Sequence, residues 1–389
     1  MPTVKAWIPA VVGMCCLGFG AGLIGIYGFF VEPLSKEFGV GVAVLNIGPV
    51  ALLLVPGIVA PMVGRLADRL PIRRIILTGV SLAMFSLFAI SQAPALWLVG
   101  LGFVCFALGL TLYGPVVING LMVKLYAGRE ARALAVAAIG ISLATATLPP
   151  VVGMLLEHLD WRWTLGSLAT GLMALLWMVV LAGLPSGIVG APARGEAPAS
   201  KAMYRQRPFW LIGFCVALGL NVSIVLAVCY PPLFSSLGYS VSDAGWFLSL
   251  AGISGLVGKA CIGWLGDAGR HYAKWLAAGL LLLQVSGLCL LLSAQGTAEL
   301  VLALCLLGYG GGAFIPMHPY LNSRYFEPAI ISQVNGAQMP LFLPFGLVGA
   351  PLAGYSFDLT GNYDSVLIAL AVTLALAALL AVRLPLAGK

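Results

Sequence analysis

Charged side chains are scarce in this sequence. Lysine, arginine, aspartate and glutamate make up 8% of the 389 residues, whereas an ordinary soluble domain carries roughly a quarter. None of the thirteen acidic residues lies deep inside an apolar stretch, and Glu32 and Asp358 come nearest to doing so. This absence argues against a proton relay built on a buried carboxylate.

Reactive motifs are also lacking. The eight cysteines lie inside apolar stretches with no CxxC spacing, so they read as small hydrophobic residues rather than as metal ligands or disulfide partners. There is no metal-ligand cluster, nucleophile motif or phosphate-binding loop, so an enzyme is the least expected class and we expect no cofactor. The formal net charge of +7 follows from loop arginines and lysines, and no basic stripe remains for binding nucleic acid.

Long apolar runs dominate what is present. Hydrophobic residues account for 61% of the chain, and a membrane-spanning helix needs roughly 20 of them in succession. Twelve stretches meet this length, which predicts an all-α membrane protein with twelve transmembrane helices. They are residues 7–31, 41–63, 74–92, 95–123, 132–156, 163–184, 208–232, 241–265, 273–294, 297–322, 331–356 and 364–384.

Basic residues fall in alternate loops. If the N-terminus is cytoplasmic, only Lys36 and Arg162 among the loop cations lie on the outer side, as the positive-inside rule requires. We therefore expect a multi-pass protein of the cell (inner) membrane with both termini in the cytoplasm.

The chain repeats itself after about 200 residues, too long a period for a solenoid. The loop stretch GRLADRLPIRR, which begins at Gly64, returns as GWLGDAGRHYAK from Gly263, and Pro150-x-x-Gly153 returns as Pro351-x-x-Gly354. The sequence thus predicts two pseudo-symmetric six-helix bundles, residues 1–184 and 208–389. Residues 185–207, rich in Pro, Gly, Ala and Ser, read as a cytoplasmic linker.

Twelve spans in two halves with GRLADRLPIRR after the second span resemble the major facilitator superfamily over essentially the whole chain. Four further stretches, YGFFVEPLSKEFG, GREARAL, DWRW and LAGYSFDLTGNYD, are similar to the branch that holds monocarboxylate transporters and oxalate/formate antiporters. The resemblance implies alternating access, in which the two halves rock around a site at the membrane midplane.

The loop after the second span is a conformational latch in that family. The resemblance assigns this role to Gly64, Asp68 and Arg69, with Arg73 and the second copy's Asp267 beside them. Asp68 can cap a helix start or pair with Arg69, Arg73 or Arg129. The alternative is a solvated loop whose arginines only set the topology.

Lys259 lies inside the apolar run 241–265, one helical turn from the loop motif. The resemblance implies a cationic anchor for an anionic substrate at this point, although the branch usually has arginine there. Lysine is a point charge, so bidentate carboxylate recognition is not implied. The alternative is a lysine that snorkels to the membrane surface.

Other polar residues fall on helices that line the cavity in the resembling family, and together they can supply the few polar groups that a site needs. Each alone is also compatible with a hydrogen bond between helices, and His318, between two prolines, with satisfying freed carbonyls. They are Tyr27, Tyr113, Asn119, Asn221, His318 and Gln338.

We therefore expect a monomeric secondary transporter of a small organic anion, a mono- or dicarboxylate. If protons are coupled, the carboxylate–Lys259 pair or His318 would carry them; uniport and anion exchange stay open. One alternative is an exporter of drug-like or amphipathic compounds; many such family members carry an arginine in the fourth span, and this sequence has none there. The other alternative is a membrane sensor that moves no solute.

Overall fold

The computed structural model of the chain describes residues 4–45, 47–187 and 202–386, and within these ranges the regular structure is helical, with no β-strand. Twelve helical stretches of the described chain are long and apolar enough to cross a membrane. This confirms the predicted all-α membrane fold. Of the predicted linker 185–207, residues 188–201 lie outside the described residues.

The chain packs into two compact units that exchange short segments. Unit 1 consists of residues 1–127, 136–197 and 327–340, and unit 2 of residues 128–135, 198–326 and 341–389. Each unit thus takes a short piece from the other half of the sequence. The division at residues 184 and 208 stays a prediction about the repeat.

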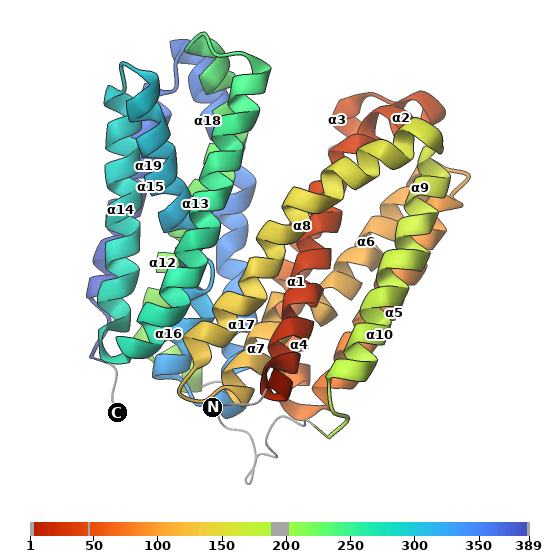
Figure 1. The fold of residues 1–389 in the computed structure, drawn as a ribbon, viewed down its shortest axis with the longest axis horizontal. Coiled ribbons are helices and arrows are strands. Elements are labelled where there is room, and N and C mark those ends of the chain that lie inside the picture. The colour runs from red at the N-terminus through yellow and green to blue at the C-terminus, as the bar shows by residue number, and fades with distance from the viewer. Residues whose placement is uncertain (1–3, 46, 188–201, 387–389) are drawn as a thin grey trace. The chain divides into compact units, whose positions relative to one another are not determined.

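Unit 1 is built from the red to yellow helices of Figure 1 and from one blue helix, α17. Its main elements are α1 (Ile8–Gly25), α2 (Gly28–Phe38), α3 (Val42–Leu45), α4 (Ile47–Arg69), α5 (Ile72–Ser91), α6 (Leu96–Tyr113), α7 (Pro115–Leu125), most of α8 (Glu130–His158), α9 (Trp161–Ser167), a π-helical turn (Leu168–Leu172), α10 (Met173–Gly183) and α17 (Ile331–Gln338).

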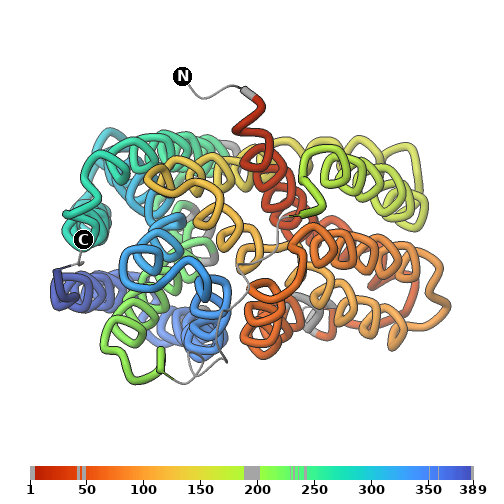
Figure 2. Tube along the Cα trace, turned by 90° about the horizontal axis from the view of Figure 1, so that it is seen from below, coloured from red at the N-terminus to blue at the C-terminus, as the bar shows by residue number. Residues whose placement is uncertain are grey.

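Unit 2 holds the start of α8 and the green to blue helices of Figure 1 other than α17. They are α12 (Arg207–Ser236), α13 (Val241–Ala268), α14 (Ala273–Ser293), α15 (Thr297–Phe314), α16 (Met317–Tyr325), α18 (Leu343–Thr360) and α19 (Asp364–Val382). Among them α14 and α19 lie side by side, as both Figure 1 and Figure 2 show.

Four of the predicted continuous spans are interrupted in the structure. The first breaks between α1 and α2, the fourth at Gly114, the tenth at Pro316, and the eleventh in the 3₁₀ turn Met339–Phe342. Gly114 is extended, and Pro115 after it has no N–H to continue the helical hydrogen bonds. The predicted runs 95–123 and 331–356 still lie within single candidate membrane spans, Leu96–Leu125 and Pro328–Phe357. The candidate spans of the first and tenth runs are Lys5–Gly25 and Thr297–Phe314, so they end at the breaks and are shorter than the predicted runs 7–31 and 297–322.

Helix ends are set by local side chains where the described loops are tight. Ser240 and Asp243 form a capping box at the start of α13, each side chain accepting from the other's backbone N–H. Asp160 caps α9 by accepting from the N–H of Trp163 at 2.8 Å. After α18, Gly361 takes the left-handed conformation (φ 72°) that glycine adopts without strain.

The start of α1 is fastened by Tyr126, just beyond α7. Its hydroxyl accepts from the N–H of Ala10 at 3.2 Å and donates to the carbonyl of Ala6 at 2.8 Å, while its ring stacks on Trp7. Burial raises the pKa of the Tyr126 hydroxyl, so it stays a proton donor. The hydroxyl thus bridges the N–H of Ala10 and the carbonyl of Ala6, two groups that would bond directly to each other in a regular α-helix.

Candidate functional site

Asp68 joins three segments of unit 1 at the end of α4. Its carboxylate accepts from the backbone N–H of Ser332 at 3.3 Å and of Gln333 at 2.8 Å, in the first turn of α17. Ile330, at the N-cap of α17, has no side chain that can accept these bonds. Asp68 therefore caps α17 from a distant part of the sequence and places a negative charge at its positive end.

A buried cation completes the arrangement. The ammonium of Lys124, in α7, lies 2.6 Å from Asp68 Oδ1, and the two side chains are 10% and 6% exposed. Sequence reasoning missed Lys124, although it is the cation that ends the fourth apolar run. The expected arginine partners do not take this place: Arg69 is exposed, Arg73 is half-buried, and neither forms an ion pair within the described chain.

Gly64 lies one helical turn before Asp68, where α4 and α17 touch through their backbones. A Cβ atom at Gly64 would stand 2.3 Å from the carbonyl oxygen of Ser332, a distance that real side chains do not show. Glycine is thus required for α17 to reach Asp68.

Unit 2 repeats this arrangement with Asp267 at the end of α13. Its carboxylate accepts from the N–H of Ala131 at 2.9 Å, at the start of α8, and lies 3.1 Å from Nε of Arg132. Arg132 is 42% exposed, so this ion pair is more solvated than the pair of Asp68 and Lys124. In both units an aspartate at the end of one helix caps the start of another helix. The cation paired with it is the buried Lys124 in unit 1 and the more exposed Arg132 in unit 2.

Four exposed residues on one face of α13 mark its lipid side. At 100° per residue, Trp246 and Trp264 point in the same direction, and Ile253 and Val257 lie within about 20° of it on either side. Trp246 and Trp264, 74% and 64% exposed, are about 27 Å apart along the helix at 1.5 Å per residue. Tryptophan concentrates at membrane interfaces, and this spacing matches a hydrocarbon core of about 30 Å.

Lys259 lies on the opposite face, about 140° around α13 from these tryptophans, and is 3% exposed. It stands about 8 Å along the helix from Trp264, inside the apolar span. Around it α13 packs closely: a Cβ at Gly255 would lie 2.9 Å from the carbonyl of Gly308, and one at Gly263 would lie 2.7 Å from Ala135. The ammonium therefore belongs to the buried face of unit 2.

Two further predicted residues of unit 2 lie on other helices. His318, in α16, is buried with its ring edge-on to Phe342, the centroids 5.4 Å apart. Asn221, in α12, buries its side-chain oxygen without a hydrogen-bond partner, and a Cβ at Gly349 would meet that oxygen at 2.4 Å.

The remaining predicted residues belong to unit 1. Tyr113 ends α6, is fully buried, and has a hydroxyl without a hydrogen-bond partner. Gln338, the last residue of α17, is buried, and Asn119 in α7 is half-buried. Tyr27 lies at the break between α1 and α2, where its hydroxyl donates to the carbonyl of Leu45.

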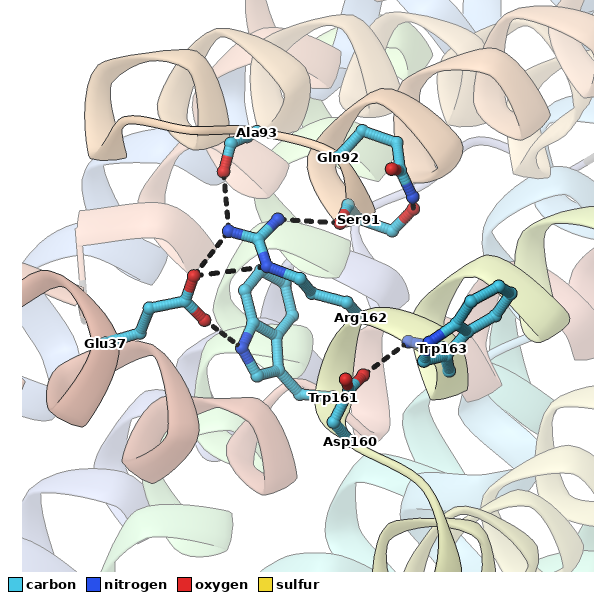
Figure 3. A network of polar contacts seen from close by, with 8 residues as sticks. All are labelled: Glu37, Ser91, Gln92, Ala93, Asp160, Trp161, Arg162 and Trp163. Carbon is cyan, nitrogen blue, oxygen red and sulfur yellow. Dashed lines mark hydrogen bonds and ion pairs between the residues drawn. The ribbon is translucent and has the colours of Figure 1, made fainter.

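A polar cluster closes the other end of unit 1, a full length of α5 away from Asp68 (Figure 3). The guanidinium of Arg162 donates to the carboxylate of Glu37 and to the carbonyls of Ser91 and Ala93, the last two at 2.7 and 2.8 Å. Trp161 donates its indole N–H to the same carboxylate. The DWRW motif thus fastens α9 to α2 and to the end of α5.

No group of three or more histidine, cysteine, aspartate or glutamate side chains in the described parts of the chain is placed to hold a metal ion. Among the predicted substrate-site residues, the available chemistry is that of one ammonium, one imidazole and a few hydroxyl and amide groups.

Comparison with known sequences gives a consistent result. The family profile described as Major Facilitator Superfamily matches residues 10–342 and, again, 209–387. Monocarboxylate transporter 12 of Rattus norvegicus is 27% identical over 307 residues, covering 69% of this chain and 60% of the relative. Monocarboxylate transporter 13 of Bos taurus is 30% identical over 253 residues, covering 62% and 57%. The chain thus spans less than two thirds of the length of these relatives.

Solved structures share the fold at low identity. The human organic anion transporter MFSD10 superimposes with a TM-score of 0.75 at 16% identity, covering 98% of this chain and 100% of that one. The proton:xylose symporter XylE gives a TM-score of 0.79 at 13% identity, covering 97% and 95%.

Proposed function

Since the chain belongs to the Major Facilitator Superfamily, we propose that it moves a small organic anion, a mono- or dicarboxylate, across the membrane by alternating access. It is a transporter rather than an enzyme, and a multi-pass membrane protein. The substrate class, the coupling to protons or to a second anion, the monomeric state and the cytoplasmic position of both termini in the inner membrane are parts of the proposal.

Lys259 is the observation that carries the anion proposal. A buried ammonium in an apolar span costs free energy, about 2.5–3.5 kcal/mol at a helix centre, and such residues mark substrate or ion pathways. A lysine that snorkels along the lipid face would share the side of Trp246 and Trp264, whereas Lys259 lies on the buried side of α13. A carboxylate bound at the ammonium would offset its desolvation.

Asn221 and His318 are the proposed orienting groups in the same unit. The buried oxygen of Asn221 without a partner can accept from a hydroxyl or a protonated acid of the substrate. His318 can hold a proton beside a bound anion, which is the route we propose for proton coupling. In unit 1 the hydroxyl of Tyr113 and the amides of Asn119 and Gln338 are further candidate donors, with Tyr27 at the helix break.

Asp68 and Asp267 are the proposed latches of the transport cycle. Each caps a helix whose start belongs to the other half of the sequence, so each bond ties the two halves of the chain together. Gly64 permits the close approach, and Arg69 and Arg73, which follow Asp68 in the sequence, are further proposed members of the latch. Monocarboxylate transporters 12 and 13 are the named relatives that support a carboxylate as cargo.

Thermal unfolding of the purified protein against a panel of small carboxylates tests the substrate class. A ligand at 100 times its dissociation constant stabilises the folded state by about 2.7 kcal/mol. We expect one carboxylate class to stabilise the wild type and to leave Lys259→Gln unchanged. Lys36→Gln, which removes an exposed cation, is the matched control and should respond as the wild type does.

A second measurement separates transport from binding. Uptake of the same carboxylate into proteoliposomes should require Lys259 and should be competed by its analogues. If no carboxylate stabilises the wild type, and apolar cations stabilise both proteins, the anion proposal fails in favour of an exporter of amphipathic compounds. Stabilisation without flux would instead indicate a sensor.

A further inference from the structure

The end of unit 1 that holds α3 contains a cavity, and Tyr27 is the one proposed transport residue in its described wall. Its volume is about 290 Å³, and its walls come from α3, α4 and α6 with the helix break at Tyr27. Leu45, Ala51, Val99 and Phe103 are among the side chains that line it.

The lining selects an apolar occupant. Among the described residues of the wall, Tyr27 supplies the one hydroxyl, and that group already donates to the carbonyl of Leu45. Water needs two to four polar partners to stay in such a space, and a dry cavity of about 150 Å³ holds one benzene molecule. A space of about 290 Å³ therefore suits a flexible hydrocarbon segment of roughly twice that size.

The cavity reaches the exposed side of α6. Trp97, Leu101 and Val104 form an exposed apolar stripe on that helix, and Val104 and Gly100 also line the cavity. Trp97 stands in the first turn, where an aromatic residue marks the membrane interface. Gly100 and Val104 follow about 5 and 10 Å deeper along the helix, at the depth of lipid acyl chains.

A second, smaller cavity of about 30 Å³ adjoins the first and shares Tyr27, Leu34 and Phe103 with it. The rings of Tyr27 and Phe103 meet edge to face, 5.3 Å between centroids, and separate the two spaces. Trp161 lines the smaller cavity and donates its indole N–H to Glu37 in the polar cluster of Figure 3.

We propose that the larger cavity binds one acyl chain of a membrane phospholipid, which enters beside α6 and ends against the Tyr27–Phe103 pair. The bound chain then rests on the break between α1 and α2, the point at which the first span can bend. The site shares only Tyr27 with the anion proposal, and among its described wall residues it uses neither Lys259 nor any other charged group.

Filling the cavity from its own wall tests this assignment. A Cβ atom at Gly100 would meet no atom within 4 Å, so Gly100→Leu can enter the cavity without a backbone clash. Gly171→Leu is the matched control, because Gly171 is exposed and open but lines neither cavity. The probe is a phosphatidylcholine with a diazirine on one acyl chain, in proteoliposomes of the full chain, with labelled residues mapped by mass spectrometry.

We expect labelling of the wall residues 45, 51, 99 and 103 in the wild type and in Gly171→Leu, and its loss in Gly100→Leu. Ala51→Leu, which fills the space from α4, should reproduce the loss and guards against a folding defect in the first variant. Labelling confined to Trp97, Leu101 and Val104 and unchanged in Gly100→Leu would overturn the proposal, since lipid would then only coat the surface.

Discussion

Removing the charge of Asp68 is the sharpest test of how the first loop is held. Asp68→Asn keeps an oxygen that can cap α17 but leaves the ammonium of Lys124 without its carboxylate. Both side chains are almost fully buried, so solvent does little to replace the lost partner.

The expected cost follows from this burial. Breaking a buried ion pair by removing one partner costs about 3–5 kcal/mol, and the retained cap places Asp68→Asn near the lower bound. Lys124→Met should cost less, about 1–2 kcal/mol, because Asp68 still accepts two backbone N–H bonds. In the double variant no unpaired charge remains, and we expect its loss to be smaller than the sum of the two by about 2 kcal/mol.

Equilibrium unfolding in mixed detergent–SDS micelles, followed by tryptophan fluorescence, measures the four proteins of this double-mutant cycle. Arg69→Gln is the control, since Arg69 is exposed and should change stability by no more than about 0.5 kcal/mol. Additive losses from Asp68→Asn and Lys124→Met, each below about 1 kcal/mol, would refute the reasoning that the pair acts as one buried unit.

Three further substitutions follow from the described contacts. Gly64→Ala should destabilise the protein by about 1–3 kcal/mol in the same unfolding assay, whereas Gly252→Ala, in open space on α13, should be neutral or stabilising. Tyr126→Phe should cost about 1–3 kcal/mol and raise hydrogen exchange at residues 6–10, and unchanged exchange there would contradict the bridging role. Arg162→Lys should speed proteolysis of the loop after α5 while Glu37→Gln has a smaller effect, because only the first loses the carbonyl contacts.

The number of spans could be predicted from the sequence, because each apolar run is by itself long enough to cross a membrane as a helix. The helix breaks did not follow, since a run such as 95–123 keeps its hydropathy across Gly114 and Pro115. The prolines are visible in the sequence, but many membrane helices tolerate a proline without a break. Whether the helix breaks there depends on how the neighbouring helices pack against it.

Some candidate site residues could be singled out from the sequence, and others could not. The positions of Asp68 and Lys259 in the sequence singled them out, because a charge beside or within an apolar run is conspicuous. Lys124 was missed because its contact with Asp68 spans 56 residues and depends on how α4 and α7 pack. The cavity beside Tyr27 has no signal at all in the sequence, since apolar residues that line a space and those that fill one look alike.

The two tryptophans of α13 also set the bilayer to which the protein is matched. The two tryptophans are about 27 Å apart along the helix, which is shorter than the hydrophobic thickness of sterol-rich membranes, about 32–33 Å. Such a mismatch costs fractions of a kcal/mol per Å, so a difference of 5 Å amounts to about 1–2 kcal/mol. That is the free energy of a strong hydrogen bond, and the lipid composition of the host membrane therefore acts on this protein as strongly as a point mutation does.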